Sequence, residues 1–429
     1  MTAFSLEPAQ LAWCAELRAL AAERLHPLAD KGEPGHVNRA LVAELGSLGL
    51  LGRLFTSGAL DLCLMRESLA YACTEAETAL ALQGLGAHPV HAYGTEAQRA
   101  RWLPRVTAGT AIAAFALSEP GAGSDAAALE LRAEADALRG GRSSGAAQAG
   151  GSPDTAQAGG SSGAAQAGRS SGTAQVGRSP DTPALAATPD GPARWRLTGE
   201  KCWISNAPEA DFYTVFARTT PGAGARGVTA FLVPADRPGL TGRGLDMLSP
   251  HPIGALDFDA VPVTADDVLG EADRGFRVAM GTLNLFRPSV GAFAVGMAQA
   301  ALDATLAHTA GRDAFGGKLR DLQAVSHQVA EMALRTEAAR LMVHAAASAY
   351  DADDPDVPRR SAMAKLLATE TAQYVVDTAV QLHGARALQR GHLLEHLYRE
   401  VRAPRIYEGA SEVQRGIIAK ELYARQEAR

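Results

Sequence analysis

The chain has 429 residues, of which 47% are hydrophobic and 21% are charged, and its formal net charge at pH 7 is −6. This composition is typical of a folded protein with two or three domains, and the slightly acidic balance argues against a nucleic-acid-binding surface. The four cysteines form no CxxC pair, which favours reduced thiols in the cytoplasm over a disulfide framework. We expect neither a secretory leader nor a membrane span, because the start of the sequence lacks a basic region followed by an apolar run and no 18-residue apolar stretch is free of charge.

The spacing of apolar residues predicts a mostly α-helical protein with a central β-domain. Residues 1–110 show helical spacing, and Thr74 followed by Glu77 predicts a capping box at the start of one helix. Residues 111–265 contain short apolar or alternating runs closed by turn residues, a pattern typical of a small sandwich or barrel.

The last third of the chain, residues 266–429, returns to long amphipathic stretches with short connections, which favours a helix bundle. Pro288 lies inside the first of these stretches. Because proline lacks an N–H and its ring clashes with the preceding turn, we expect it to kink or interrupt that helix.

A repetitive segment interrupts the β-domain. Residues 147–182 contain four copies of a nine-residue repeat that begins Ala-Gln-(Ala/Val)-Gly, and residues 138–146 are a diverged copy. Leu138 and Val176 are the only large apolar residues in 138–182, so the segment is predicted to be a disordered loop. A β-helix would need inward-pointing aliphatic residues, which the repeat lacks.

The segment from His392 to His396 reads His-Leu-Leu-Glu-His and matches an inverted zinc-protease pattern. No third ligand is evident nearby, so we predict helix-surface histidines and no metal site.

Four segments are more informative. The first, from Leu117 to Asp125, reads LSEPGAGSD. Its proline and glycines permit a tight turn whose N–H groups can point at an anion, with the hydroxyls of Ser118 and Ser124 beside it. Alone, the segment could be any loop that leaves a strand.

The second segment, from Gly199 to Asn206, reads GEKCWISN. Trp203 and Ser205 are two residues apart, so a strand would present the indole and the hydroxyl on one side. The indole face suits a planar ring, although a tryptophan in a strand is more often a core residue.

The third segment, from Arg312 to Gly316, reads RDAFG, and Gln323 follows it. Arginine binds pyrophosphate through charge-assisted hydrogen bonds, but an arginine at a helix end is also a common solvated cap.

The fourth segment, from Arg405 to Arg415, reads RIYEGASEVQR. Glu408 stands before a glycine and ahead of a final helix. It could be a desolvated base with a raised pKa or an ordinary acid in the first turn of that helix.

In this order and at this spacing, the four segments resemble the acyl-CoA dehydrogenase family. The resemblance covers the chain outside 138–182. It implies an N-terminal helical domain over 1–110, a middle β-barrel over 111–265 and a C-terminal four-helix bundle over 266–429, with FAD bound between the β-domain and the bundle.

The resemblance also implies a reaction, the desaturation of an acyl-CoA thioester to the trans-2-enoyl-CoA. Glu408 would remove the α-proton, and its backbone N–H would hydrogen-bond the thioester carbonyl. The β-hydrogen would leave as hydride to FAD. The implied substrate-binding residues are Ser124, Asn284, Arg287, Tyr407 and Gly409.

The implied FAD-binding residues come from all four segments and from one further helix. They are Leu117, Ser118, Gly123, Ser124, Trp203, Ser205, Arg312, Phe315, Gln323, Gln381, Gly384, Ala410 and Glu412. Those from Arg312 to Gly384 would bind the adenine half from a neighbouring subunit. The sequence departs from the family at Ala385, where a second glycine is usual, and at Ala410, where threonine is common.

The partners implied are an acyl-CoA substrate, an electron-transferring flavoprotein as acceptor, and further copies of the chain in a homodimer or homotetramer. Neither nucleic acid nor a membrane is expected. Three alternatives remain at this stage: desaturation of an acyl group on a carrier protein, oxidase chemistry with O₂, and a helical scaffold without catalysis. The sequence does not indicate the length or branching of the acyl chain.

Overall fold

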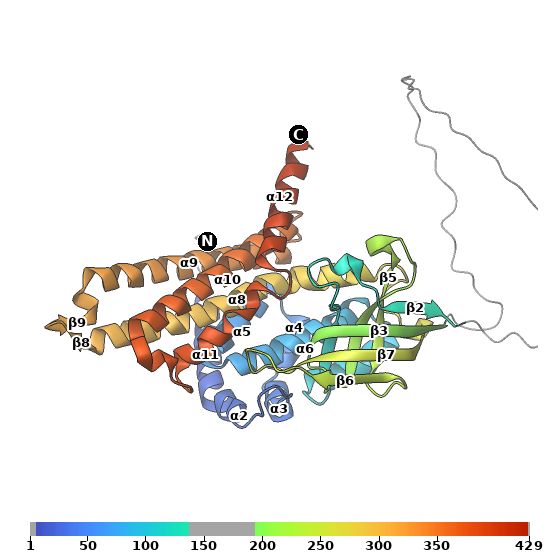
Figure 1. Cartoon of the computed structure of the whole chain (residues 1–429), viewed down its shortest axis with the longest axis horizontal. Coiled ribbons are helices and arrows are strands. Elements are labelled where there is room, and N and C mark those ends of the chain that lie inside the picture. The colour runs from blue at the N-terminus through green and yellow to red at the C-terminus, as the bar shows by residue number, and fades with distance from the viewer. Residues whose placement is uncertain (1–5, 137–193, 428–429) are drawn as a thin grey trace, which may run out of the picture.

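The computed structural model describes residues 6–136 and 194–427, so the repeat at 138–182 lies outside the described residues. A helical N-terminal segment, a curled sheet and a long helix bundle follow one another along the chain (Figure 1). The sheet lies at one end of helix α8 (Gly275–Gly311), and the small hairpin of β8 (Asp313–Ala314) and β9 (Gly317–Lys318) lies at the other.

Seven α-helices and one π-helical turn form the N-terminal segment that is described. They are α1 (Pro8–Leu20), the π-turn Ala21–Leu25, α2 (His26–Ala29), α3 (Arg39–Ser47), α4 (Leu50–Thr56), α5 (Ala59–Ala72), α6 (Thr74–Tyr93) and α7 (Glu96–Thr107). The capping box predicted at Thr74 is wrong, because Cys73 precedes the helix and Thr74 is its first residue. The Glu77 side chain instead pairs with Arg66 on α5.

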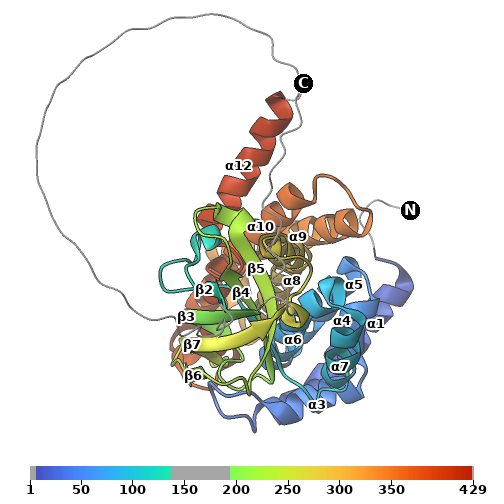
Figure 2. The same ribbon diagram turned by 90° about the vertical axis from the view of Figure 1, so that its right-hand side faces the viewer.

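The middle of the chain folds into a curled sheet of seven strands within the described residues. The strands are β1 (Ala113–Ala116), β2 (Arg132–Ala135), β3 (Arg194–Ser205), β4 (Phe212–Arg218), β5 (Val228–Pro234), β6 (Leu240–Gly244) and β7 (Ile253–Thr264). Their order is β1-β4-β2-β3-β7-β6, and β5 pairs with β4. All residues of β5 and all but the last of β4 are buried. Helix α6 packs against β1 and β4, and α8 packs against β5, with the N-terminal helices on one side of the sheet (Figure 2).

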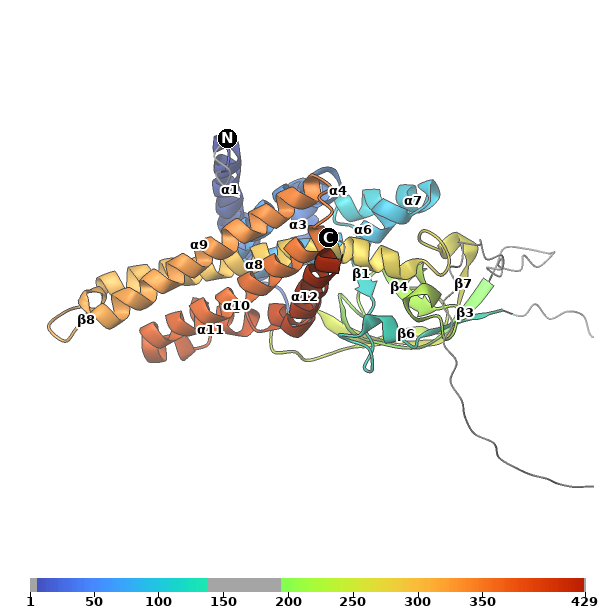
Figure 3. The same ribbon diagram turned by 90° about the horizontal axis from the view of Figure 1, so that it is seen from above.

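The C-terminal bundle consists of α8, α9 (Gln323–Asp351), α10 (Val357–His383), α11 (Leu393–Glu400) and α12 (Ser411–Glu427). Helices α8, α9 and α10 run side by side (Figure 3), and α12 stands away from the body (Figure 2). Helix α8 is long and apolar enough to cross a membrane, but 72% of its most apolar window is buried in the protein. It is the core helix of the bundle.

Of the two outcomes predicted at Pro288, a kink or an interruption, the interruption is wrong, because α8 continues through this residue. Proline offers no N–H to the carbonyl of Asn284, one turn earlier. The hydroxyl of Ser361 on α10 donates to that carbonyl at 3.3 Å instead. A neighbouring helix thus satisfies the acceptor that Pro288 leaves free.

Candidate active site

Glu408 lies in a short connection ahead of α12, three residues before the helix begins, so it is not an acid of the first helical turn. Its φ is 52° and that of Gly409 is 93°, which places two consecutive residues in the left-handed region. A non-glycine residue adopts this conformation only where the surroundings impose it, and such residues concentrate at functional sites. A side chain at Gly409 would also collide with Nε2 of Gln414, 2.5 Å away.

Three side chains hold the backbone at Glu408 and Gly409. The carbonyl of Glu408 accepts hydrogen bonds from Nε of Arg287 at 3.3 Å and from Nε2 of Gln414 at 3.1 Å. The carbonyl of Gly409 accepts from Nζ of Lys365 at 2.7 Å and from Gln414 at 2.9 Å. Since Arg287, Lys365 and Gln414 are buried, these contacts fix the position of the Glu408 side chain.

The carboxylate of Glu408 has one buried oxygen without a partner among the described residues and a raised pKa. Its Oε2 is buried and makes no hydrogen bond within the described part of the chain. Burial raises the pKa of Glu408, and the positive charges of Arg66, Lys365 and Arg287 oppose this rise in that order. A half-buried carboxylate with a free oxygen and a raised pKa has the properties of a general base.

The predicted substrate residues surround Glu408, with one exception. Arg287 also donates from Nη1 to Oδ1 of Asn284 at 3.3 Å. The two side chains are therefore paired on the same face of α8. Tyr407 directly precedes Glu408 in this connection, and its side chain is 37% exposed. Ser124 is the exception, because it lies in the exposed turn after β1.

The turn between β1 and β2 and the strand β3 are joined by a buried ion pair. Nζ of Lys201 donates to the carbonyl of Leu117 at 2.9 Å and to Oε1 of Glu119 at 2.7 Å, and no part of Lys201 is exposed. Burial lowers the pKa of Lys201 to about 8. The carbonyl of Ser118 also accepts from the backbone N–H of Cys202 at 3.0 Å. The first and second sequence segments therefore meet in space.

The surface formed by these two segments suits a planar, phosphorylated cofactor. Trp203 is 49% exposed with a φ of 56°, so it is not a core residue, and Ser205 is half-buried on the same strand. Gly121 and Gly123 are exposed, and no atom lies within 4 Å of a side chain built at either. Their backbone is open to an anion such as a phosphate.

A second group of predicted cofactor residues lies at the far end of the bundle. This group consists of Arg312, Phe315, Gln323, Gln381 and Gly384. Arg312 follows α8 and Gly384 follows α10, and the rings of His308 and His383 stack at 4.1 Å between these two helix ends. Phe315 is 90% exposed. Because α8 has 37 residues and rises about 1.5 Å per residue, the group lies about 55 Å from the β-domain end of α8.

Ala410 is half-buried, and Glu412 is an exposed acid in the first turn of α12. The two histidines of the zinc-like pattern have separate partners. His392 accepts from the backbone N–H of Leu394, whereas Nε2 of His396 lies 2.6 Å from Oγ1 of Thr74. No group of three metal-ligating side chains is found among residues 6–136 and 194–427.

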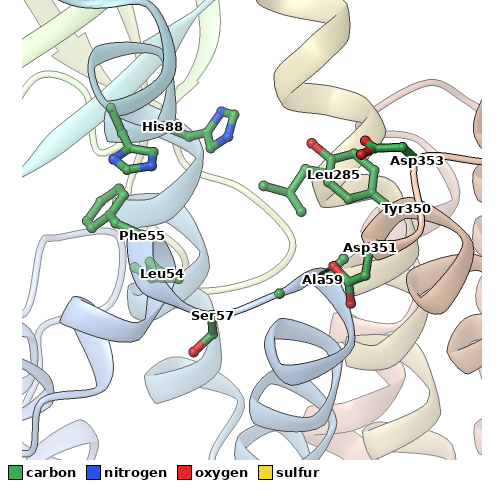
Figure 4. A pocket seen from close by; sticks show the side chains of 11 residues that line it. Leu54, Phe55, Ser57, Ala59, His88, Leu285, Tyr350, Asp351 and Asp353 are labelled. Carbon is green, nitrogen blue, oxygen red and sulfur yellow. Dashed lines mark hydrogen bonds between the residues drawn. The ribbon is translucent and has the colours of Figure 1, made fainter.

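A cavity of about 300 Å³ lies between the N-terminal helices and the bundle (Figure 4). His88 and Phe55 form one wall, and Leu285 and Tyr350 face them. His91 also lines the cavity, with its ring 5.4 Å from that of Phe55. Glu408 is not among its lining residues.

Three family models match the chain in succession. They describe the N-terminal, middle and C-terminal domains of acyl-CoA dehydrogenases and match residues 7–110, 174–261 and 273–423. The chain belongs to the acyl-CoA dehydrogenase family. The expected three-domain fold is confirmed, and the family makes the chain an FAD-dependent oxidoreductase.

Relatives and solved structures match over nearly the whole chain. The mitochondrial short-chain specific acyl-CoA dehydrogenase of Bos taurus is 33% identical over 417 residues, which cover 94% of this chain and 88% of that protein. Butyryl-CoA dehydrogenase from Megasphaera elsdenii has a TM-score of 0.80 at 28% identity and covers 98% of this chain and 99% of its own. A structure reported as the electron transferring flavoprotein of Acidaminococcus fermentans contains a chain with a TM-score of 0.79 at 27% identity. The match covers 98% of this chain and 99% of that chain.

Several buried charged residues of this acyl-CoA dehydrogenase were not singled out from the sequence. Glu119 and Lys201 lie inside the first two segments, where a charged pair between glycines and apolar residues is a usable signal. Lys365 interrupts an apolar helix face, which is a weaker signal. Arg66 and Glu77 come from different helices, so only the fold reveals their contact.

Proposed function

We propose that the enzyme desaturates an acyl-CoA thioester between its α- and β-carbons, with Glu408 as the base that removes the α-proton. The observation that supports this most strongly is the free, buried Oε2 of Glu408 beside three cationic side chains. A carboxylate that already had a hydrogen-bond donor would be a weaker acceptor for a proton from carbon.

The backbone around Glu408 serves the same step. Removal of the α-proton places negative charge on the thioester oxygen, and an N–H aimed at that oxygen stabilises the charge. In this proposal, the N–H of Glu408 is that donor. The bonds from Arg287, Lys365 and Gln414 to the two neighbouring carbonyls hold the peptide in place before substrate arrives. Asn284 and Arg287 would contact the CoA chain, with Tyr407 and Gly409 beside the acyl group.

The residues present fit FAD. Leu117, Ser118, Gly123, Ser124, Trp203, Ser205, Ala410 and Glu412 would hold the flavin and its nearer phosphate. FAD supplies the acceptor for the β-hydrogen when it is bound. The side chain of Trp203 would cover the face of the ring, because its indole is exposed beside the open turn at Gly121 and Gly123.

The adenine half would be bound by a second subunit. The group from Arg312 to Gly384 lies where α8 and α10 end near the β8–β9 hairpin, whereas β3, which carries Trp203, belongs to the sheet at the other end of α8 (Figures 1 and 3). One chain therefore cannot present both groups to one cofactor. A homodimer or homotetramer in which each bundle reaches a partner's β-domain satisfies this geometry. Phe315, almost fully exposed in the single chain, would be covered there.

We infer that an electron-transferring flavoprotein accepts the electrons, as the likeness to a chain in the Acidaminococcus fermentans structure suggests. The four cysteines are free, which fits a reducing compartment such as the cytoplasm.

Anaerobic titration of the holoenzyme with short acyl-CoA esters tests the proposal. Loss of the oxidised flavin absorbance together with formation of enoyl-CoA is the expected result. Unchanged absorbance with every ester would contradict it. Rapid re-oxidation by air in the absence of a flavoprotein acceptor would indicate oxidase chemistry instead.

A further inference from the structure

A histidine–glutamate pair joins the sheet to the helix bundle. Nε2 of His251, in the connection between β6 and β7, lies 2.6 Å from Oε2 of Glu400, the last residue of α11. The two side chains are 13% and 1% exposed. Within residues 6–136 and 194–427, it is the only ion pair between the sheet domain and helices α8 to α12. The proton transfer described above makes no use of it.

On the sheet side, the pair is attached to the strand that carries proposed FAD-binding residues. Pro252, which follows His251, accepts a hydrogen bond through its carbonyl from the backbone N–H of Asn206 at 2.7 Å. The next residue, Ile253, is the first residue of β7 and pairs with Ser205 on β3. Because these contacts follow directly in the chain, a displacement of His251 is passed to the end of β3.

On the bundle side, the pair is attached to the connection that carries the proposed base. Glu400 ends α11, and Glu408 follows eight residues later. The chain between them turns back on itself, because the N–H groups of Ile406 and Tyr407 donate to the carbonyl of Ala403 at 2.8 Å and 3.2 Å. Since this link is short and internally hydrogen-bonded, the position of Glu400 constrains the position of Glu408.

The pair is ionised, although it is buried. Burial acts against the charge on His251, yet the neighbouring carboxylate of Glu400 raises the pKa of His251. Burial also acts against the charge on Glu400, and His251 lowers the pKa of that carboxyl. Oε1 of Glu400 has no partner among the described residues, so the bond through Oε2 holds the carboxylate. Other titratable groups from α6, α11 and the connection before α12 also face the pair: Glu75, Glu77, His396, Arg399 and Tyr407.

The proposed reaction depends on the separation of the two attached segments. The α-proton and the β-hydrogen leave from adjacent carbons, so the base and the strand beside FAD must keep a fixed distance. A misplacement of about 1 Å can lower a rate by about 100-fold. We propose that His251 and Glu400 are positioning residues that hold the end of β3, with Trp203 and Ser205, at the distance from Glu408 that desaturation requires. This inference rests on the proposed function.

Stopped-flow flavin reduction of the holoenzyme by the best acyl-CoA separates positioning from binding. His251→Leu should lower the limiting rate by about tenfold or more. The Kd for the acyl-CoA should stay within about twofold, because the proposed CoA contacts of Asn284 and Arg287 are left in place. His251→Gln keeps a donor for Oε2 of Glu400, so it should recover most of the rate.

His36→Leu is the matched control. Nδ1 of His36, in the connection between α2 and α3, lies 2.6 Å from Oε1 of Glu209 in the sheet domain, but these side chains are 56% and 32% exposed. Its loss should leave the limiting rate unchanged. Visible circular dichroism of the oxidised holoenzyme without substrate is a readout besides activity. Since Trp203 would cover the flavin ring, the signal should change in His251→Leu and stay the same in His36→Leu.

The pH dependence gives a further readout that a merely stabilising pair would not show. Because the pKa of His251 is raised, the charged bond is present at lower pH and is lost as pH rises through that pKa. The limiting rate and the flavin dichroism of the wild type should therefore change together on the alkaline side. The amide of His251→Gln does not titrate, so this variant should lack that joint change.

An unchanged limiting rate in His251→Leu would overturn the positioning role, even if its Tm falls. A slow rate that His251→Gln does not restore, or an alkaline transition that persists in His251→Gln, would overturn it as well. If His251→Leu does not fold, the glutamine variant and the wild-type pH profile still decide. Failure of every acyl-CoA to reduce the wild-type flavin would refute the proposed function, whereas the dichroism would still test whether the pair places the flavin.

Discussion

Nε of Arg287 donates a hydrogen bond to the carbonyl of Glu408 at 3.3 Å, so the residue proposed to lie beside CoA also positions the proposed base. The two residues are separated by 121 positions in the chain and come from α8 and from the connection before α12. If Arg287 contacts CoA as proposed, binding of CoA would therefore also act on the position of the Glu408 backbone.

Replacing Glu408 by glutamine should leave the fold and FAD content intact and abolish desaturation. The amide has nearly the same shape but cannot take up the α-proton, so we expect flavin reduction to slow by about 100-fold or more. Anaerobic stopped-flow absorbance with the best acyl-CoA measures the rate. Near-normal reduction by the variant would rule out Glu408 as the base.

The rate should depend on pH through the raised pKa of Glu408. Since the base must be ionised, flavin reduction should fall as pH drops through a pKa above the ordinary glutamate value. Lys365 stabilises the carboxylate, so Lys365→Met should raise that pKa and move the acidic limb to higher pH. The rate of flavin reduction, measured as a function of pH for the wild type and for Lys365→Met, tests this. If the pH at which the rate falls on the acidic side is unchanged or lower in the variant, the prediction is contradicted.

Lys201→Met should weaken FAD retention and stability together. The change leaves the buried carboxylate of Glu119 without its cation and frees the carbonyl of Leu117, at a cost of about 3–5 kcal/mol for a broken buried pair. Thermal unfolding and released flavin fluorescence report the two effects. Adding Glu119→Gln should recover part of the stability, and no recovery would show that the pair is not the cause.

Arg312→Ala should lose FAD on dilution faster than the wild type. If the adenine half is held by a second subunit, dissociation of subunits must weaken FAD binding, because the two equilibria are linked. Light scattering gives the oligomeric state and flavin fluorescence gives the bound fraction. Arg320→Ala, an exposed arginine close by, is the matched control. A stable monomer with stoichiometric FAD is incompatible with shared binding.

Replacing residues 138–182 by a short Gly-Ser linker should leave turnover within about twofold and stability unchanged or slightly raised. The flanking strands explain why. The N–H of Asp136 donates to the carbonyl of Arg194 at 2.9 Å, and β2 pairs with β3 as far as Ala135 and Trp195, so the two ends already lie at the close of a hairpin. An inactive or unfolded deletion would mean that the repeat belongs to the site or to the subunit interface.

Local patterns in the sequence predicted a helical, β and helical order, and the resemblance of four segments to the acyl-CoA dehydrogenase family implied the three-domain fold, the FAD cofactor and the oxidoreductase class. Helical spacing and strand alternation depend on near neighbours, and the segments around Ser118, Trp203, Arg312 and Glu408 each keep a short, specific order of residue types. Where a prediction depended on one local rule, a distant partner changed the outcome. The hydroxyl of Ser361 donates to the carbonyl of Asn284, which Pro288 leaves without a donor. The side chain of Glu77 forms an ion pair with Arg66 and not the predicted capping box with Thr74.

The chemistry of the site was decided by the tertiary structure. Glu408 could be read from the sequence as a base or as an ordinary helix-start acid, and only packing buried its Oε2 and surrounded it with Arg66, Lys365 and Arg287. These cations come from α5, α10 and α8, whose order in space no local pattern specifies. A carboxyl's pKa depends on charges and burial within a few ångströms, and those neighbours are far apart in the chain.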